Sequence, residues 1–263
     1  MHGPGWTRMN APEAAVARAF LDERRQQRRH VVISLSGAHA YGFPSPDSDL
    51  DLKALHLAPT RAWLGFGRAE GAVDFLGVID GIEVDYTSNE LGGALQGALK
   101  GNGNYLERLL GGCALYADPL LDGLQPVVRA NLSRRVAGHY RGFARALHLR
   151  LSEPGATWKH VLYVLRSLLT GVHLLRTGEV QPDLSLLCDA HGFGQARAWI
   201  AAKRAGERTP LPPAALAEGL AVTERAFASL DAAVPTSILP AEPADPAALE
   251  AWLVEARLGM LST

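Results

Sequence analysis

Two aspartates with one residue between them, Asp49 and Asp51, are the side chains of this sequence best suited to chemistry. Side chains two positions apart on a strand point to the same face, with their Cα atoms about 6.5–7 Å apart. Leu50 and Leu52 would then turn to the opposite, buried side. Converging carboxylates repel each other unless a cation lies between them, and a divalent metal ion neutralises them best. The pair therefore predicts a metal site.

A glycine-rich turn precedes the two aspartates. The apolar run Val31–Leu35 is followed by Ser36, Gly37 and Ala38, and a further glycine stands at Gly42. Glycines let the backbone approach a phosphate closely, and successive backbone amides form a concavity that binds anions. Together with the paired carboxylates, this turn predicts a site for a metal-bound nucleoside triphosphate.

A hairpin further along the chain offers a third carboxylate. Two β-prone runs flank Asp80 and Gly81, and an Asp-Gly pair is typical of a type I′ turn, in which both central residues have positive φ. On the second strand of this hairpin, Glu83 and Asp85 share one face. From the residues alone, either acid could complete the metal site.

Other interpretations of the aspartates fare less well. An EF-hand loop would need glycine at the position of Leu52 and glutamate at the position of Ala58, so the calcium-loop interpretation fails. The chain contains no G-x-x-x-x-G-K-[ST] sequence and no G-x-G-x-x-G after a strand, which excludes a P-loop and a dinucleotide-binding turn. A solvated polar turn is the remaining alternative, because proline, aspartate and serine are common turn formers.

The sequence motif of residues 37–53 resembles that of the DNA polymerase β-like nucleotidyltransferase superfamily. The motif reads G-A-H-A-Y-G-F-P-S-P-D-S-D-L-D-L-K. The signature of that superfamily is a Gly-Ser turn, an Asp-x-Asp strand and a third carboxylate on a later strand. Within the superfamily, the wording is most similar to a family of bacterial nucleotidyltransferases associated with RNA repair. That family places the third carboxylate just before a helix opened by a polar residue and Glu-Leu, here residues 88–91, which favours Asp85 over Glu83.

The resemblance implies an activity. Two Mg²⁺ or Mn²⁺ ions would be held by Asp49, Asp51 and Asp85, and NMP would move from an NTP to an acceptor hydroxyl with release of pyrophosphate. ATP is the favoured nucleotide and an RNA end the favoured acceptor. A protein or small-molecule acceptor is an alternative, and a nucleotide-binding or regulatory module is another. The oligomeric state is left open.

One departure from the family pattern concerns the phosphates. The position usually held by serine is Ala38, so a hydroxyl that would bind a phosphate is missing. The backbone amides around Gly37 and Ala38 would then hold the phosphates, with Ser36 as a second source of a hydroxyl. The missing hydroxyl weakens the expected grip on the triphosphate, while the carboxylates favour retained chemistry.

Residues 157–177 form the clearest helix of the sequence, closed by Gly178 as expected for a C-cap. Lys159, Arg166 and His173 recur every seven residues and therefore share one side of this helix. Such a stripe is usually a solvated face. The family resemblance extends to this helix, however, and implies that Lys159 and Arg166 reach the triphosphate or the substrate.

Composition and charge set the wider frame. The chain has 263 residues, 48% of them hydrophobic and 20% charged, which is typical of a globular protein. A formal net charge of −1 excludes a broadly basic surface that would coat nucleic acid, though not a local basic groove. Two cysteines cannot form a disulfide framework, and the polar N-terminus and lack of a long apolar run predict a cytoplasmic protein without membrane contact.

Strand signals dominate to about residue 87, and helical periodicity takes over from about Asp118. We therefore expect an α+β nucleotidyltransferase core with a mixed sheet, followed by an all-helical region. The expected domains are a catalytic domain with an N-terminal helix over residues 1–118 and a helical domain over residues 119–263, which closes the nucleotide cleft.

Overall fold

The computed structural model describes residues 3–64, 66, 69–206 and 211–261. The chain folds into two compact units, neither of which is one continuous stretch. The first unit comprises the chain up to Gly37, Asp49–Leu132 and the chain from Glu242 onward, and the second comprises Ala38–Ser48 and Ser133–Ala241. The functional division at residue 118 stays a prediction.

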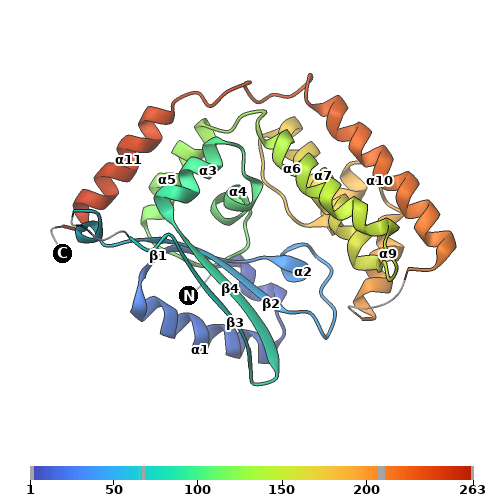
Figure 1. Ribbon diagram of the computed structural model, residues 1–263, viewed down its shortest axis with the longest axis horizontal. Helices are drawn as coiled ribbons and strands as arrows, with labels where there is room; N and C mark the ends of the chain where they lie inside the picture. Colours follow the sequence, from blue (N-terminus) through green and yellow to red (C-terminus); the bar gives the residue numbers. More distant parts are fainter. Residues whose placement is uncertain (1–2, 65, 67–68, 207–210, 262–263) are drawn as a thin grey trace. The chain divides into compact units, whose positions relative to one another are not determined.

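The first unit is built on a five-stranded mixed sheet with the strand order β3-β4-β2-β1-β5. Its strands are β1 (Arg29–Leu35), β2 (Leu50–Leu57), β3 (Ala72–Ile79), β4 (Ile82–Glu90) and β5 (Ala114–Ala117). Strands β2 and β4 run parallel at the centre, and the other pairs are antiparallel. The mixed sheet and its helices, with the helices that follow in the chain, confirm the expected α+β class (Figure 1).

The β3–β4 hairpin forms as the sequence predicts. Its two-residue loop is Asp80 and Gly81, with φ of 49° and 80°. Positive φ at both positions is the property of a type I′ turn, whose twist matches that of the two strands. On β4, Val84 and Tyr86 are buried, whereas Glu83 is exposed and Asp85 is half-buried. The turn therefore fixes the register that places Asp85 on the polar face.

Helices cover both faces of this sheet (Figure 1). The elements are η1 (Pro4–Arg8), α1 (Ala11–Gln27), η2 (Thr60–Trp63), α3 (Leu91–Leu99), α4 (Gly103–Leu110), α5 (Leu120–Ala130) and α11 (Pro246–Gly259). Phe20 of α1 packs on Phe75 and Tyr86, with ring centroids 5.1 and 5.3 Å away. On the other face, Arg108 of α4 donates to the carbonyl of Ala54 at 3.2 Å and to the side chain of Asn89.

The second unit is helical and is organised around α7 (Trp158–Thr177). The helices α6 (Val136–Leu149), α8 (Leu184–Ala190), α9 (Ala196–Arg204) and α10 (Pro213–Ala233) all pack against it, and η3 (Arg150–Ser152) follows α6. Thr157 caps the N-terminus of α7 in a box with His160, and Gly178 ends it with φ of 75°. Both ends of this helix confirm the sequence-based prediction, because capping residues are local signals.

Two local features differ from the expectation. The glycine-rich turn contains one turn of helix, α2 (Gly37–Ala40), rather than an irregular loop. Strand β5, which pairs with β1, lies in a stretch for which no strand was expected. It is only four residues long, and so short a run carries too little alternation to be recognised.

Candidate functional site

Asp51 and Asp85 lie side by side on neighbouring parallel strands. In the β2–β4 pairing, Asp51 is the register partner of Asp85. Side chains of register partners point to the same face of a sheet, so both carboxylates stand on the polar face. Leu50 and Leu52, with 0% exposure, turn to the opposite side as predicted. Strand pairing thus joins carboxylates that are far apart in the sequence.

Lys53 joins these two carboxylates. Its Nζ lies 2.7 Å from Oδ1 of Asp85 and 3.9 Å from Oδ1 of Asp51. The three side chains are 18–43% exposed, so water screens the pair only partly. The lysine stands where a cation must lie if two carboxylates are to approach each other. Sequence analysis did not single out Lys53, although its position two residues after Asp51 put it on the same face.

Gly37 brings the backbone of the glycine-rich turn against Asp51. Its φ of 57° lies in the left-handed region, and a Cβ at this position would overlap with the carboxylate of Asp51. Just before it, the amide of Ser36 donates to the carbonyl of Asp51 at 2.9 Å. Only glycine satisfies both the backbone conformation and the contact. The turn and the carboxylate strand are therefore joined, as the spacing of the two motifs predicts.

Asp49 stands just before β2, which begins at Leu50, and is half-buried. Among the described residues, no three His, Cys, Asp or Glu side chains gather closely enough to hold a metal ion. The donor set nevertheless fits a hard divalent cation, because Asp51 and Asp85 supply adjacent carboxylate oxygens. Asp49 is two positions before Asp51 in the chain. The residues fit a magnesium site on these two strands, with Lys53 between them.

A model of the RNA repair pathway DNA polymerase beta family, RlaP, matches residues 15–255. The match includes the glycine-rich turn, both carboxylate strands and all of the helical unit. The chain belongs to this family. The range matched by the model of the RNA repair pathway DNA polymerase beta family contains Asp49, Asp51 and Asp85.

The chain also has similarity to one curated protein and to one solved structure. An uncharacterized protein of Methanocaldococcus jannaschii, MJ0002, is 28% identical over 159 residues, which are 59% of this chain. The chain spans 64% of the length of that curated relative. A nucleotidyltransferase-like protein from Exiguobacterium sibiricum has a crystal structure with 12% identity and a TM-score of 0.33, over 91% of this chain and 78% of the other.

In this member of the RNA repair pathway DNA polymerase beta family, Arg166 is buried rather than solvated. It is 2% exposed, and its guanidinium lies 3.8 Å from the ring centroid of Tyr41. Tyr41 in turn packs edge-on against Tyr163 of α7, with centroids 5.5 Å apart. The solvated-face interpretation is therefore wrong for Arg166. The helix places this arginine against the segment 38–48, which leads into Asp49.

The other two members of the stripe lie apart from Arg166 and are half-buried. The Nζ of Lys159 is 5.6 Å from the ring centroid of Tyr163. His173 pairs with His191 of the α8–α9 connection at 3.3 Å, and burial lowers the pKa of both imidazoles, that of His191 to about 4. Arg166 also affects His139. Burial is the main cause that lowers the pKa of His139, and the positive charge of the Arg166 guanidinium lowers it further.

Two further cations on α9 hold the same segment, and neither is among the predicted site residues. Lys203 is 0% exposed, and its Nζ donates to the hydroxyls of Ser45 and Ser48 at 2.9 and 2.8 Å. Arg204 donates to the carbonyl of Gly42 at 2.6 Å. A lysine near the C-terminus of a helix ordinarily reads as a solvated charge, so no local signal identified it.

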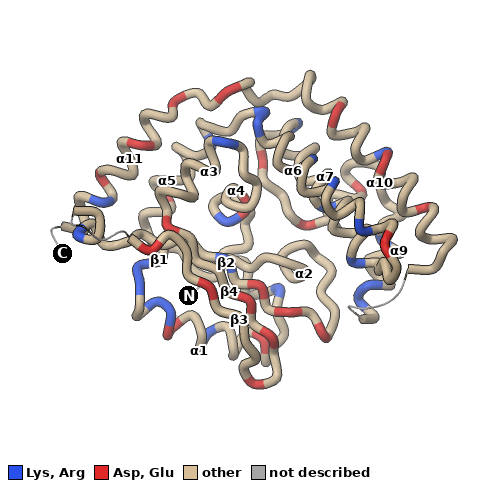
Figure 2. The backbone as a smooth tube through the Cα atoms, viewed as in Figure 1, with Lys and Arg blue, Asp and Glu red and all other residues tan. Residues whose placement is uncertain are grey.

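The structure thus divides the predicted site residues between the two units. Ser36, Gly37, Asp49, Asp51 and Asp85 belong to the first unit, and Ala38, Lys159 and Arg166 belong to the second. Figure 2 shows acidic residues on β3 and β4 and basic residues along α6 and α7.

Within the part of the chain that the structure describes, no helix is both long and apolar enough to cross a membrane.

Proposed function

We propose that this protein is a metal-dependent nucleotidyltransferase that moves NMP from an NTP to an acceptor hydroxyl and releases pyrophosphate. The observation that carries the proposal is the pairing of Asp51 with Asp85 on parallel strands beside the turn at Gly37. Membership of the RNA repair pathway DNA polymerase beta family supports the same reaction class and favours an RNA end as acceptor. ATP is the nucleotide that we favour.

Asp49, Asp51 and Asp85 hold two Mg²⁺ or Mn²⁺ ions in this proposal. Bound ions of this kind neutralise the triphosphate and lower the pKa of an acceptor hydroxyl. Asp85 accepts the proton of the acceptor hydroxyl, whose oxygen forms a bond to the α-phosphorus. The bond from that phosphorus to the bridging oxygen breaks, and both electrons leave with pyrophosphate. Asp51 and Asp49 keep the reacting groups in line, which is the main contribution of protein side chains to such transfers.

In this proposal, the glycine-rich turn and the helical unit bind the phosphates of the nucleotide. Backbone amides around Gly37 and Ala38, with the hydroxyl of Ser36, bind the phosphates. Arg166 and Lys159 provide positive charge toward the triphosphate, as the family resemblance implies. Lys203 acts as a positioning residue, because it fixes the hydroxyls of Ser45 and Ser48 in the segment that leads into Asp49.

The proposal is tested by direct transfer. The full chain is incubated with each α-labelled NTP, Mg²⁺ or Mn²⁺, and a panel of RNA, protein and small-molecule acceptors, and the label on the acceptor is measured. We expect labelled RNA with ATP, and no label when EDTA is present or when Asp51 is replaced by Asn. Transfer at full rate in EDTA, or by the Asp51→Asn variant, would overturn the two-metal proposal.

Two observations favour a second function, that of a nucleotide-binding or regulatory module. Lys53 already neutralises Asp51 and Asp85, and Ala38 supplies no hydroxyl for a phosphate. A protein of this kind would bind an NTP without transferring it. Ala38→Ser would restore one hydrogen bond to a charged acceptor and tighten NTP binding by about 1.5–3 kcal/mol at most. Calorimetry with a non-hydrolysable NTP measures this change, and binding without any transfer supports the module.

A further inference from the structure

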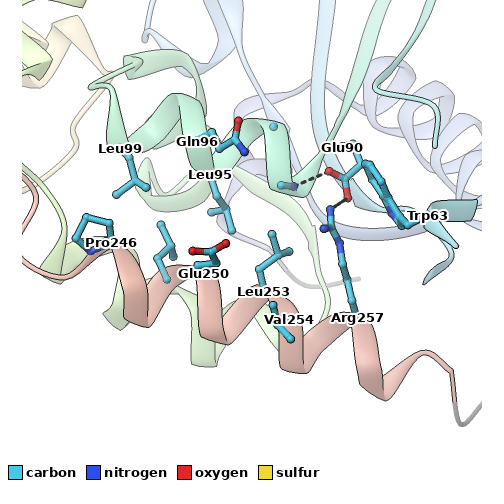
Figure 3. Close-up of a pocket in the computed structure, with 13 residues that line it drawn as sticks. Trp63, Glu90, Leu95, Gln96, Leu99, Pro246, Glu250, Leu253, Val254 and Arg257 are labelled. Carbon is cyan, nitrogen blue, oxygen red and sulfur yellow. Dashed lines mark hydrogen bonds and ion pairs between the residues drawn. The ribbon is translucent and has the colours of Figure 1, made fainter. Parts of the chain in front are cut away.

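A pocket of about 490 Å³ lies in the first unit, away from the carboxylates. Figure 3 shows it between α3 and α11, with η2 at one end. Its floor is apolar and is formed by leucines of both helices: Leu95, Leu99, Leu249 and Leu253. A volume of this size is typical of sites for small molecules, which combine an apolar lining with a few fixed polar groups.

One end of the pocket is held rigid by an ion pair. Arg257 lies 2.9 Å from Oε1 of Glu90, whose side chain is 5% exposed, and the guanidinium stacks over the Trp63 ring at 4.5 Å. The hydroxyl of Thr60 donates to the carbonyl of Arg257 at 2.5 Å, which joins η2 to α11. A Cβ at Gly92 would meet the side-chain ends of both Arg257 and Glu90, so α3 approaches this pair closely. The charges at this end are therefore already balanced.

The part of the pocket away from this ion pair carries a carboxylate that is not balanced. Glu250 of α11 is exposed, lies between Pro246 and Leu253 beside the space between the two helices (Figure 3), and has no hydrogen bond or ion pair with any residue that the structure describes. Glu90 and Arg257 cancel each other, so the charged residues of the lining sum to −1. A carboxylate beside an apolar floor attracts a cation and repels an anion.

Trp63 adds an aromatic surface that is still accessible. The residue is 44% exposed even though Arg257 covers one face of its ring. Glu250 and Arg257 are seven residues apart on α11, which corresponds to about 10 Å along the helix axis. A ligand that contacts both ends must therefore be elongated, with a polar group at one end and a flat or apolar group at the other.

We propose that this pocket binds a small organic amine with an apolar body about 10 Å long. The ammonium group donates to Glu250, the body lies on the leucine floor, and an aromatic end packs against Trp63. The site is separate from the proposed transfer site. Glu90 and Asp85 are five residues apart on β4, so the two sites stand about 16 Å apart along that strand.

The probe pair phenylbutylamine and phenylbutyrate tests the proposal, because the two share a phenyl ring on a four-carbon chain and end in an ammonium and a carboxylate, respectively. Titration of the ¹⁵N-labelled full chain, followed by NMR, reports binding through the Trp63 indole signal, which a Trp63→Phe variant assigns. We expect the amine to bind about tenfold more tightly than the acid and to shift the amide signals of Gly92 and Gly93. Equal affinity for amine and acid would overturn the proposal.

Two glutamate variants on the same helix complete the test. Glu250→Gln keeps the shape of the side chain and removes its charge, so the amine should bind about fivefold more weakly. Glu255→Gln is the matched control, because Glu255 is exposed like Glu250 but does not line the pocket. Unchanged affinity in Glu250→Gln, or an equal loss in both variants, would refute the role of Glu250. No nucleotide is present, so the outcome is independent of the transfer reaction.

Discussion

The carboxylates of the first unit and the cations of the second differ in how the fold holds them. Asp51 and Asp85 are partly exposed on a sheet face, where strand register places them side by side and Lys53 pairs with both. Arg166 and Lys203 are buried at 2% and 0% exposure. They lie against aromatic rings and serine hydroxyls of the segment 38–48. The carboxylates are therefore partly open to solvent, whereas the cations are buried.

This difference indicates a division of tasks. A group that binds a metal ion or takes up a proton must be reached by water and ligand, and partial exposure permits this. A buried cation costs free energy unless it is well hydrogen-bonded, and the interactions that satisfy it also order the surrounding chain. We infer that the carboxylates carry the chemistry, and that the buried cations shape the segment leading into Asp49.

The largest expected effect is on transfer. Asp51→Asn removes one charge from the carboxylate pair and should lower transfer by about a thousandfold or more, which corresponds to about 4 kcal/mol of the barrier. The melting temperature should stay close to that of the wild type, because Asp51 is partly exposed. A double variant with Asp49→Asn and Asp51→Asn should transfer only slightly more slowly than Asp51→Asn alone, since the two acids act as a unit. Single-turnover assays and thermal melts check both statements.

The second effect is on stability and concerns the buried lysine. Lys203→Ala removes two hydrogen bonds and leaves a cavity, so the free energy of unfolding should fall by about 2–4 kcal/mol. Lys159→Ala is the control, because the half-buried Lys159 makes a looser contact with Tyr163 and should cost less than about 1 kcal/mol. Urea unfolding measures both. Equal losses in the two variants would remove the contrast between buried and partly exposed cations.

The third effect tests whether a buried arginine still serves the nucleotide. Arg166→Ala should raise the KM for NTP about tenfold, because one positive charge is withdrawn from the triphosphate. Arg176→Ala, at the exposed end of the same helix, should leave the KM unchanged. A loss of stability in Arg166→Ala with an unchanged KM would make this arginine a structural residue alone.

The carboxylate region could be predicted from the sequence because its signals are local. Alternation on β2 gave the faces of Asp51 and Leu52, and the Asp80-Gly81 loop gave the hairpin that carries Asp85. The positions of Arg166 and Lys203 could not be predicted in the same way. Their burial depends on the segment 38–48, whose contacts with α7 and α9 join residues more than a hundred positions apart. Periodicity identifies a face of a helix, but not what covers that face.

The smallest expected effect is a pH dependence of the free energy of unfolding. It arises from His30, which pairs with Tyr86 on the face of the sheet opposite the carboxylates. Burial lowers the pKa of His30 to about 3 from an ordinary value of 6.5, and its Nε2 lies 2.6 Å from the Tyr86 hydroxyl. Between these pH values the unfolded chain binds a proton that the folded chain does not, so stability falls as the pH drops. When the pH falls from 6.5 to 5.5, the free energy of unfolding of His30→Gln should therefore drop by about 1 kcal/mol less than that of the wild type. Urea unfolding at both pH values measures this, and identical losses would contradict it.

The central claim is that Asp51 and Asp85 jointly hold a divalent ion together with the triphosphate. Titration of Mn²⁺ into the full chain with a non-hydrolysable ATP analogue, followed by electron paramagnetic resonance, measures this binding directly. We expect Asp51→Asn and Asp85→Asn each to weaken Mn²⁺ binding about tenfold or more. Glu83→Gln, an exposed acid on the same face of β4, should leave the binding unchanged. Wild-type affinity in Asp85→Asn, or a loss confined to Glu83→Gln, would contradict the claim.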